Sequence, residues 1–363
     1  MTGIRESEKP AVKAEQAKTI KLPSMALGLD CSADGSELYA ACMDGGIFRV
    51  NTASGEAQAL AHHESYASGV CLVPGTPLLI SAGYDGVIQW HDLSAKKTIR
   101  KVAAHRFWSW QSAVSADGKY FASVTGQYLA GGPKYEPAPE TEPSVKVFDA
   151  VSGKIVHEFS HVPSVQAVTF SPDNKYVAAG NLMGEIRVWE LASGKQLTSF
   201  TTPSFTSWGI IKAHCYQGGV YSLAFSPDAE SILACGIGPM RDPNSGNGKQ
   251  TWQRFAWRRA GSPRIGEIRE GDAGGGHPES IAFHPSSKYF VMAGRLAQGK
   301  WNTGFFDESS GALIHSLDTK GRLTRIRFDA KGTQMFLAGG VGQPKAKDGK
   351  YPPFGRIMAY QLA

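Results

Sequence analysis

The sequence lacks a run of about 18 consecutive apolar residues, the length that a helix needs to cross a bilayer. Residues 1–18 are polar and charged, without the apolar stretch of a secretory signal peptide. Charge is sparse as well: 19% of the residues are charged and the net charge is +6, which does not by itself indicate a nucleic-acid partner. We therefore expect no membrane span and a cytoplasmic location, with a secreted chain whose leader has been removed as the alternative.

Cysteine is scarce and follows no pattern. The five cysteines form no CxxC pair and are odd in number: Cys31, Cys42, Cys71, Cys215 and Cys235. This spacing argues against a disulfide framework and against a zinc site. Reduced thiols fit an intracellular protein.

The chain also lacks the short motifs of common catalytic and nucleotide-binding sites. It has no GxxxxGK[ST] or GxGxxG loop, no GxSxG nucleophile elbow and no HExxH helix. The segment 242–248 begins like a calcium loop, but Gly246 stands where Asp or Asn is needed and no acidic residue closes the loop. We expect no catalytic residues, no metal ion and no cofactor.

What the sequence has instead is a repeat. The 42 glycines and 20 prolines indicate many tight turns. Each copy is a short apolar strand, a turn rich in Pro, Asp, Gly, Asn or Ser, and a second strand of apolar and small residues, which is typical of a β-hairpin. Four clear copies occupy residues 168–181, 223–236, 281–294 and 326–339, and three weaker ones occupy 29–42, 70–83 and 112–125.

A third strand follows each hairpin, and a fourth leaves it after a turn such as ASG at 192–194. The third strand ends in a mostly aromatic residue, and these residues form a column: Val50, His91, Phe148, Trp189, Trp257, Phe306 and Tyr360. Four antiparallel strands in each of seven units predict an all-β, seven-bladed β-propeller. We expect Trp189 and Trp257 to pack between blades.

The repeat resembles the WD-repeat family over roughly residues 17–363, most closely at residues 168–200, which contain IRVWELASGK. The copies depart from the family pattern, because none contains Trp-Asp itself and the turn Asp is kept only as Asp44 and Asp85. The resemblance implies a non-enzymatic scaffold for protein–protein interaction. It implies no particular partner. We expect the fold unit to be a monomer.

Closure of the ring predicts how the chain is divided. The seventh copy ends after its third strand, whereas residues 18–22 (KTIKL) form a strand that precedes the first copy. Placing this N-terminal strand as the missing fourth strand closes the ring and leaves no open edge. We therefore expect a disordered tail at residues 1–16 and a single propeller at residues 17–363.

Insertions are confined to one side of the expected ring. They follow the second strand of blades three, five, six and seven and the fourth strand of blade four, at residues 126–143, 237–251, 295–301, 340–354 and 202–219. Both connection types emerge on the same face of a four-stranded blade, and one-sided insertions usually mark a binding face. Loop self-packing is the alternative for their aromatic residues.

The partner-binding residues that we expect on this face are aromatic anchors and charged flanks: Trp108, Trp110, Tyr135, Trp208, Arg241, Arg295, Trp301, Lys347 and Tyr351. The inserts of blades five to seven carry a net charge of +5, and that of blade three a net charge of −2, so a dipolar rim could steer a protein partner.

Two other functions remain open. The first is a propeller enzyme of hydrolase, lyase or oxidoreductase type at the channel mouth, where histidines precede five inner strands: His63, His105, His161, His214 and His277. Such histidines more often form hydrogen bonds within a blade than bind a metal. The second is a binder of an acidic polymer through blades five to seven.

Overall fold

The computed structural model describes residues 12–127, 138–208, 216–238, 248–342, 344–345, 347 and 352–363. Within these residues there are seven antiparallel blades of four strands each and no α-helix. No helix in this part of the chain has the length and apolar character that a membrane span requires.

The first four blades each consist of four consecutive strands. Blade 1 is β2 (Ala26–Cys31), β3 (Glu37–Cys42), β4 (Gly46–Asn51) and β5 (Ala57–His62); blade 2 is β6 (Ala67–Leu72), β7 (Leu78–Gly83), β8 (Val87–Asp92) and β9 (Lys97–Ala103); blade 3 is β10 (Gln111–Val114), β11 (Tyr120–Val124), β12 (Val145–Asp149) and β13 (Ile155–Phe159); blade 4 is β14 (Val165–Phe170), β15 (Tyr176–Asn181), β16 (Glu185–Glu190) and β17 (Gln196–Thr201).

The last three blades complete the ring. Blade 5 is β20 (Val220–Phe225), β21 (Ile232–Ile237), β22 (Gly248–Phe255) and β23 (Arg264–Glu267); blade 6 is β24 (Gly275–Phe283), β25 (Tyr289–Gln298), β26 (Thr303–Asp307) and β27 (Leu313–Leu317); blade 7 is β28 (Arg322–Phe328), β29 (Gln334–Gly340), β30 (Gly355–Leu362) and β1 (Ala14–Leu22). Two 3₁₀ turns, η1 (Pro203–Phe205) and η3 (Glu270–Asp272), and a hairpin of β18 (Thr206–Trp208) and β19 (Tyr216–Gly218) lie in connections.

The first strands of the blades line a central channel. They contact one another in a closed circuit, in the order β2, β6, β10, β14, β20, β24, β28 and back to β2. The predicted seven-bladed propeller is therefore confirmed.

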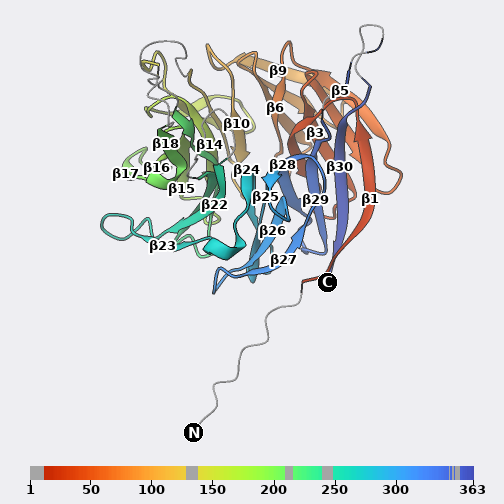
Figure 1. Ribbon diagram of the computed structural model, residues 1–363. Helices are drawn as coiled ribbons and strands as arrows, with labels where there is room; N and C mark the ends of the chain where they lie inside the picture. The colour runs from red at the N-terminus through yellow and green to blue at the C-terminus, as the bar shows by residue number, and fades with distance from the viewer. Residues whose placement is uncertain are drawn as a thin grey trace.

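The N-terminal strand closes the ring, as predicted. β1 pairs antiparallel with β30, from Ala14 opposite Leu362 to Leu22 opposite Gly355, and Figure 1 shows these two strands side by side. The strand is longer than the expected residues 18–22, because residues 14–16, which we assigned to the tail, also pair with β30. Backbone pairing does not depend on apolar side chains, so a polar segment can extend a strand without an apolar pattern. Residues 1–11 of the expected tail lie outside the described residues.

The turn between the first and second strands repeats one hydrogen-bond pattern. In blade 4 the Ser171 hydroxyl donates to Asp173 Oδ1 at 2.6 Å and accepts from the Tyr176 amide at 2.9 Å. The same Ser-x-Asp pattern recurs in blades 1, 3 and 5. Because the side chains satisfy the turn's own backbone, these turns stay short.

The column of third-strand residues lies between blades, with one correction. Trp189 is 3% exposed and its ring stacks on Phe159 of blade 3 at 4.9 Å. In blade 5 the residue at the column position is Phe255, which pairs with Ile232. Trp257 follows two residues later, after β22 has ended, but it is also buried, because it packs edge-to-face on Tyr176 of blade 4.

Strands extend into the expected insertions of blades 5–7. β25 continues to Gln298 and pairs there with Gly275 of β24, although we expected a loop from residue 295. Bridges from Gly248 to Gly276 and from Arg295 to Arg322 join blades 5, 6 and 7 into one sheet. The glycine-rich strand ends let neighbouring backbones approach closely enough for these bridges.

Candidate interaction face and channel mouth

The two faces of the ring differ in their connections. We call the face that bears the second-to-third-strand connections and the links between blades the loop face. The other, the turn face, bears the Ser-x-Asp turns and the tight turns before each fourth strand. Glycines with positive φ shape these tight turns, for example Gly55 (φ 80°) and Gly194 (φ 71°).

An aromatic cluster lies on the loop face of blades 2 and 3. The Trp108 ring stacks on Tyr84 at 4.6 Å between centroids and on Phe107 at 4.8 Å. Trp110 packs edge-on to both Trp108 and Tyr84, and Tyr66 lies 5.6 Å from Tyr84. Trp108 is nevertheless 40% exposed and Tyr66 43% exposed. The cluster is therefore preorganised and still accessible.

The backbone of blade 3 holds this cluster in place. Thr125 donates its hydroxyl to the Trp108 carbonyl at 2.8 Å, and the Trp110 indole donates to the Gly126 carbonyl at 2.9 Å. The Ser109 hydroxyl meets that of Ser123 at 2.8 Å. With the backbone and Trp110 fixed, the Trp108 ring faces outward at little cost in conformational entropy.

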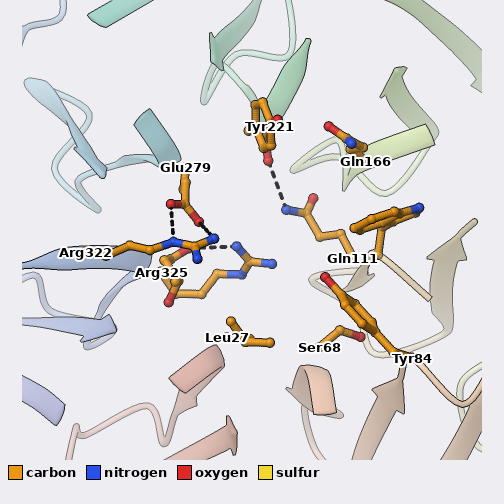
Figure 2. A pocket seen from close by; sticks show the side chains of 11 residues that line it. Leu27, Ser68, Tyr84, Gln111, Gln166, Tyr221, Glu279, Arg322 and Arg325 are labelled. Atoms are coloured by element: carbon orange, nitrogen blue, oxygen red, sulfur yellow. Dashed lines mark hydrogen bonds and ion pairs between the residues drawn. The ribbon is translucent and has the colours of Figure 1, made fainter. Parts of the chain in front are cut away.

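Beside the cluster, the channel opens into a cavity of about 110 Å³. Figure 2 shows its lining, which comes from the first strands of several blades, from the link before β10 and, at Tyr84, from the connection between β7 and β8. Tyr84 and Trp110 belong both to the aromatic cluster and to this lining. The cluster and the channel mouth therefore form one continuous site.

A bidentate ion pair forms one wall of the mouth. Arg322 donates from Nε to Glu279 Oε1 at 2.6 Å and from Nη2 to Oε2 at 2.9 Å. Burial opposes ionisation of Glu279, but the Arg322 guanidinium outweighs it and holds the pKa of that carboxyl below its usual value. The same pair raises the pKa of Arg322. Both groups are therefore charged and neutralise each other.

Two further arginines of β28 lie deeper. Arg327 Nε donates to Asp30 Oδ1 at 3.3 Å. Arg325 lies between the two ion pairs, and its guanidinium donates from Nη1 to the Thr324 carbonyl at 2.7 Å. Burial and the neighbouring Arg327 lower the pKa of Arg325 to about 10, so that it stays charged at neutral pH. Among the described residues, Arg325 has no carboxylate partner.

The predicted site residues divide into three groups. Trp108, Arg295 and Lys347 are exposed, and Trp110 is half-buried. Trp301 is a correction: it is 5% exposed, and its indole donates to the Asp272 carbonyl at 3.0 Å. The chain re-enters blade 6 directly after the long strand β25, so this ring fills the core instead of a loop. The other predicted residues, Tyr135, Arg241 and Tyr351 and the side chain of Trp208, lie outside the described residues.

The acidic side of the expected dipolar rim has internal partners. Glu140 accepts hydrogen bonds from Ser144 and from the His161 amide, and Glu142 pairs with Lys146 at 2.8 Å. These two glutamates fix the blade 3 insertion to its own blade and the next one. They are thus less available to steer a partner than we expected.

The described histidines that precede inner strands lie apart from one another. His63 contacts Asp85 at 3.0 Å and Ser81 at 2.9 Å, both in blade 2, the blade that follows it. His105 likewise contacts Ser123 of blade 3 at 2.8 Å. Within the described ranges, no group of three His, Cys, Asp or Glu residues could hold a metal ion. His214 lies outside them.

These features define a class: a closed seven-bladed propeller whose loop face combines exposed aromatic rings with a charged channel mouth. The family model of the WD domain, G-beta repeat, matches residues 153–190, from the fourth strand of blade 3 through the third strand of blade 4, and residues 205–238, which include the first two strands of blade 5. The match confirms the predicted resemblance to the WD-repeat family over this part of the chain.

Several curated proteins are similar over part of the chain. The chain is 26% identical to Protein HIR1 of Yarrowia lipolytica over 194 residues, 52% of this chain and 15% of that protein. It is 26% identical to apoptotic protease-activating factor 1 of Rattus norvegicus over 207 residues, 56% of this chain and 15% of that protein. It is 30% identical to the SAGA complex/transcription factor TFIID complex subunit Taf5 of Schizosaccharomyces pombe over 81 residues, 22% of this chain and 13% of that protein. The chain therefore spans only a small part of these relatives.

Sequence reasoning missed Tyr66, Tyr84 and the charged residues of the channel. One signal was visible: β28 reads RLTRIRF, with three arginines in a strand expected to line the channel. Arginine is rare in strand interiors unless its charge has a partner or a role. The position of Glu279, 43 residues earlier, gave no sequence-level hint of the ion pair.

Proposed function

We propose that this WD-repeat protein is a non-enzymatic scaffold that holds a protein partner on its loop face, with Trp108 as the central anchor. The observation that carries the proposal is the accessible Trp108 ring stacked between Tyr84 and Phe107. A Trp that is already ordered loses little entropy on binding, and Trp and Tyr are enriched at binding hot spots. One of the similar proteins is named as a subunit of two complexes, which agrees with such a role.

Most of the other exposed large apolar residues lie on outer strands or in turns, and none of them is an aromatic ring. Ile99, Ile155 and Leu197 lie on the outer strands β9, β13 and β17, each on a different blade. Single exposed apolar residues of this kind are ordinary on a protein surface. The cluster at Tyr66 and Trp108 instead gathers two exposed rings beside a hollow.

A matched pair of variants tests the proposal. Trp108→Ala removes the anchor from the loop face, whereas Val151→Ala shortens a residue that is 52% exposed in a tight turn of the turn face. Proteins captured from a lysate by the wild-type chain should be retained by Val151→Ala and depleted about tenfold or more by Trp108→Ala. Equal capture by all three proteins would refute the docking role of this cluster.

The proposed location is the cytoplasm. The four described cysteines, Cys31, Cys42, Cys71 and Cys235, are free thiols. Free thiols agree with a reducing compartment.

A further inference from the structure

The channel mouth contains a positive charge and several hydrogen-bond donors that the fold does not use. Arg322 and Glu279 neutralise each other, as do Arg327 and Asp30. The Arg325 guanidinium between them offers five N–H donors in total and is left without a carboxylate in the described part of the chain. Figure 2 shows this guanidinium reaching into the middle of the pocket.

Neutral donors face the same space. Tyr84 and Tyr221 line the pocket, and the hydrogen bond that Figure 2 draws from Gln111 Nε2 to Tyr221 ends on the Tyr221 backbone carbonyl, so it leaves the Tyr221 hydroxyl free to donate. Burial raises the pKa of Tyr84 to about 12, so that its hydroxyl keeps its proton and can donate. The side-chain amide of Gln166 also lines the pocket, and its Nε2 can donate two hydrogen bonds. A guanidinium without a carboxylate partner, surrounded by groups that can donate hydrogen bonds, fits an anionic ligand.

We propose that the channel mouth binds a single carboxylate group, with Arg325 as its counter-ion and the hydroxyls of Tyr84 and Tyr221 as further donors. Hydrogen bonds from a guanidinium to a carboxylate are charge-assisted and geometrically matched. This inference does not rest on the docking role of Trp108, because the ligand group contacts Arg325 and not the exposed ring.

Size and charge both favour a carboxylate. A cavity of about 150 Å³ holds benzene, with six heavy atoms. The mouth, with about 110 Å³, suits a group of slightly smaller size, such as propionate or a glutamate side chain. One unpaired cation balances a monoanion, whereas a phosphate dianion would leave an uncompensated negative charge beside Glu279.

The carboxylate could come from a free small acid or from an acidic side chain of a protein partner. Four probes distinguish these cases on the full chain by saturation-transfer NMR titration: propionate, the uncharged propionamide, a glutamate residue blocked at both ends, and inorganic phosphate. We expect propionate to bind about tenfold or more tightly than propionamide. Binding of the blocked glutamate as well indicates a partner side chain as the source, and binding of propionate alone indicates a free acid.

Variants locate the site. Arg325→Gln should weaken propionate binding about tenfold or more, whereas Lys195→Gln, which removes an exposed cation on the turn face, should leave it unchanged. If Arg325→Gln does not fold, the double variant Tyr84→Phe, Tyr221→Phe replaces it, with an expected loss of about threefold or more. The proposal is wrong if propionamide binds as well as propionate, if phosphate binds more tightly, or if the folded variant at Arg325 or the tyrosine pair binds propionate like the wild type.

The test of the carboxylate site can fail independently of the test of the scaffold function. Trp108→Ala should retain propionate binding, because it removes no donor from the pocket. If Trp108→Ala captures partners normally while propionate binding still depends on Arg325, the scaffold proposal fails and the carboxylate site stands. If Trp108→Ala loses its partners while propionate binding does not depend on Arg325, only the carboxylate proposal fails.

Discussion

Replacing Leu22 by alanine should destabilise the protein by about 3 kcal/mol, near the middle of the range for buried leucines. Leu22 is 1% exposed and belongs, with Ile20, to a core cluster that contains Leu29 and Leu38 of blade 1 and Phe336 of blade 7. Its side chain thus fills the boundary that the N-terminal strand seals. Unfolding entropy is about 2.1 cal/mol/K per residue, or about 0.8 kcal/mol/K for this chain, so the melting temperature should fall by about 4 °C.

The same strand provides its own control. Lys21 points outward between Ile20 and Leu22 and is exposed, so Lys21→Ala should change stability by less than about 0.5 kcal/mol. Thermal melts followed by circular dichroism, with urea unfolding as a second measure, compare the two variants. Removing both Ile20 and Leu22 should expose the edge of β30 and promote aggregation. If Leu22→Ala melts together with Lys21→Ala, then β1 does not hold the ring closed.

Three further outcomes follow from the buried side chains. Trp301→Ala should cost about 3–5 kcal/mol, like Trp189→Ala, and a near-normal urea midpoint for the Trp301 variant would contradict its place in the core. Burial, reinforced by His63, lowers the pKa of His91 to about 4, and burial, reinforced by Arg187, lowers that of His161 to about 3. Below pH 6.5 these histidines become protonated in the unfolded chain but stay neutral in the folded chain. The free energy of unfolding is therefore at its full value above pH 6.5 and should fall as the pH drops from 6.5 to 5. A melting temperature that stays constant over this window would refute the assignment. Burial raises the pKa of Cys71 to about 12, so iodoacetamide at pH 8 should modify it, by peptide mapping, only after unfolding.

The architecture could be predicted from the sequence because its signals are local and repeated. The Ser-x-Asp turns, as at Ser171 and Asp173, place the same hairpin in several blades, and the hydrogen bonds that make them need no distant partner. Ring closure was also predictable, because an unpaired third strand at one end of the chain and a spare strand at the other allow one arrangement without an open edge.

The positions that were misassigned depend on contacts made after folding. Trp301 follows a segment that reads as a loop, and only the extension of β25 to Gln298 returns the chain to the blade at that point. Trp257 was assigned to the column of third-strand residues because it is aromatic. Phe255, two residues earlier, occupies that position in blade 5. The channel site is non-local for a stronger reason: Tyr84, Tyr221 and Arg325 come from three blades and meet only when the ring closes.

The pairing of β1 with β30 has a mechanical consequence. Ala14 lies opposite Leu362, and the Lys13 amide donates to the Ala363 carbonyl at 2.9 Å, so the two strands enter and leave the ring at the same point, beside the end marked C in Figure 1. A force that pulls these two points apart would load the hydrogen bonds of this pair one after another, like a zipper, instead of all at once in shear. The ring should then open first between blades 7 and 1 and at a low force. A force applied between two points on the loop face would instead be resisted by the paired strands of whole blades.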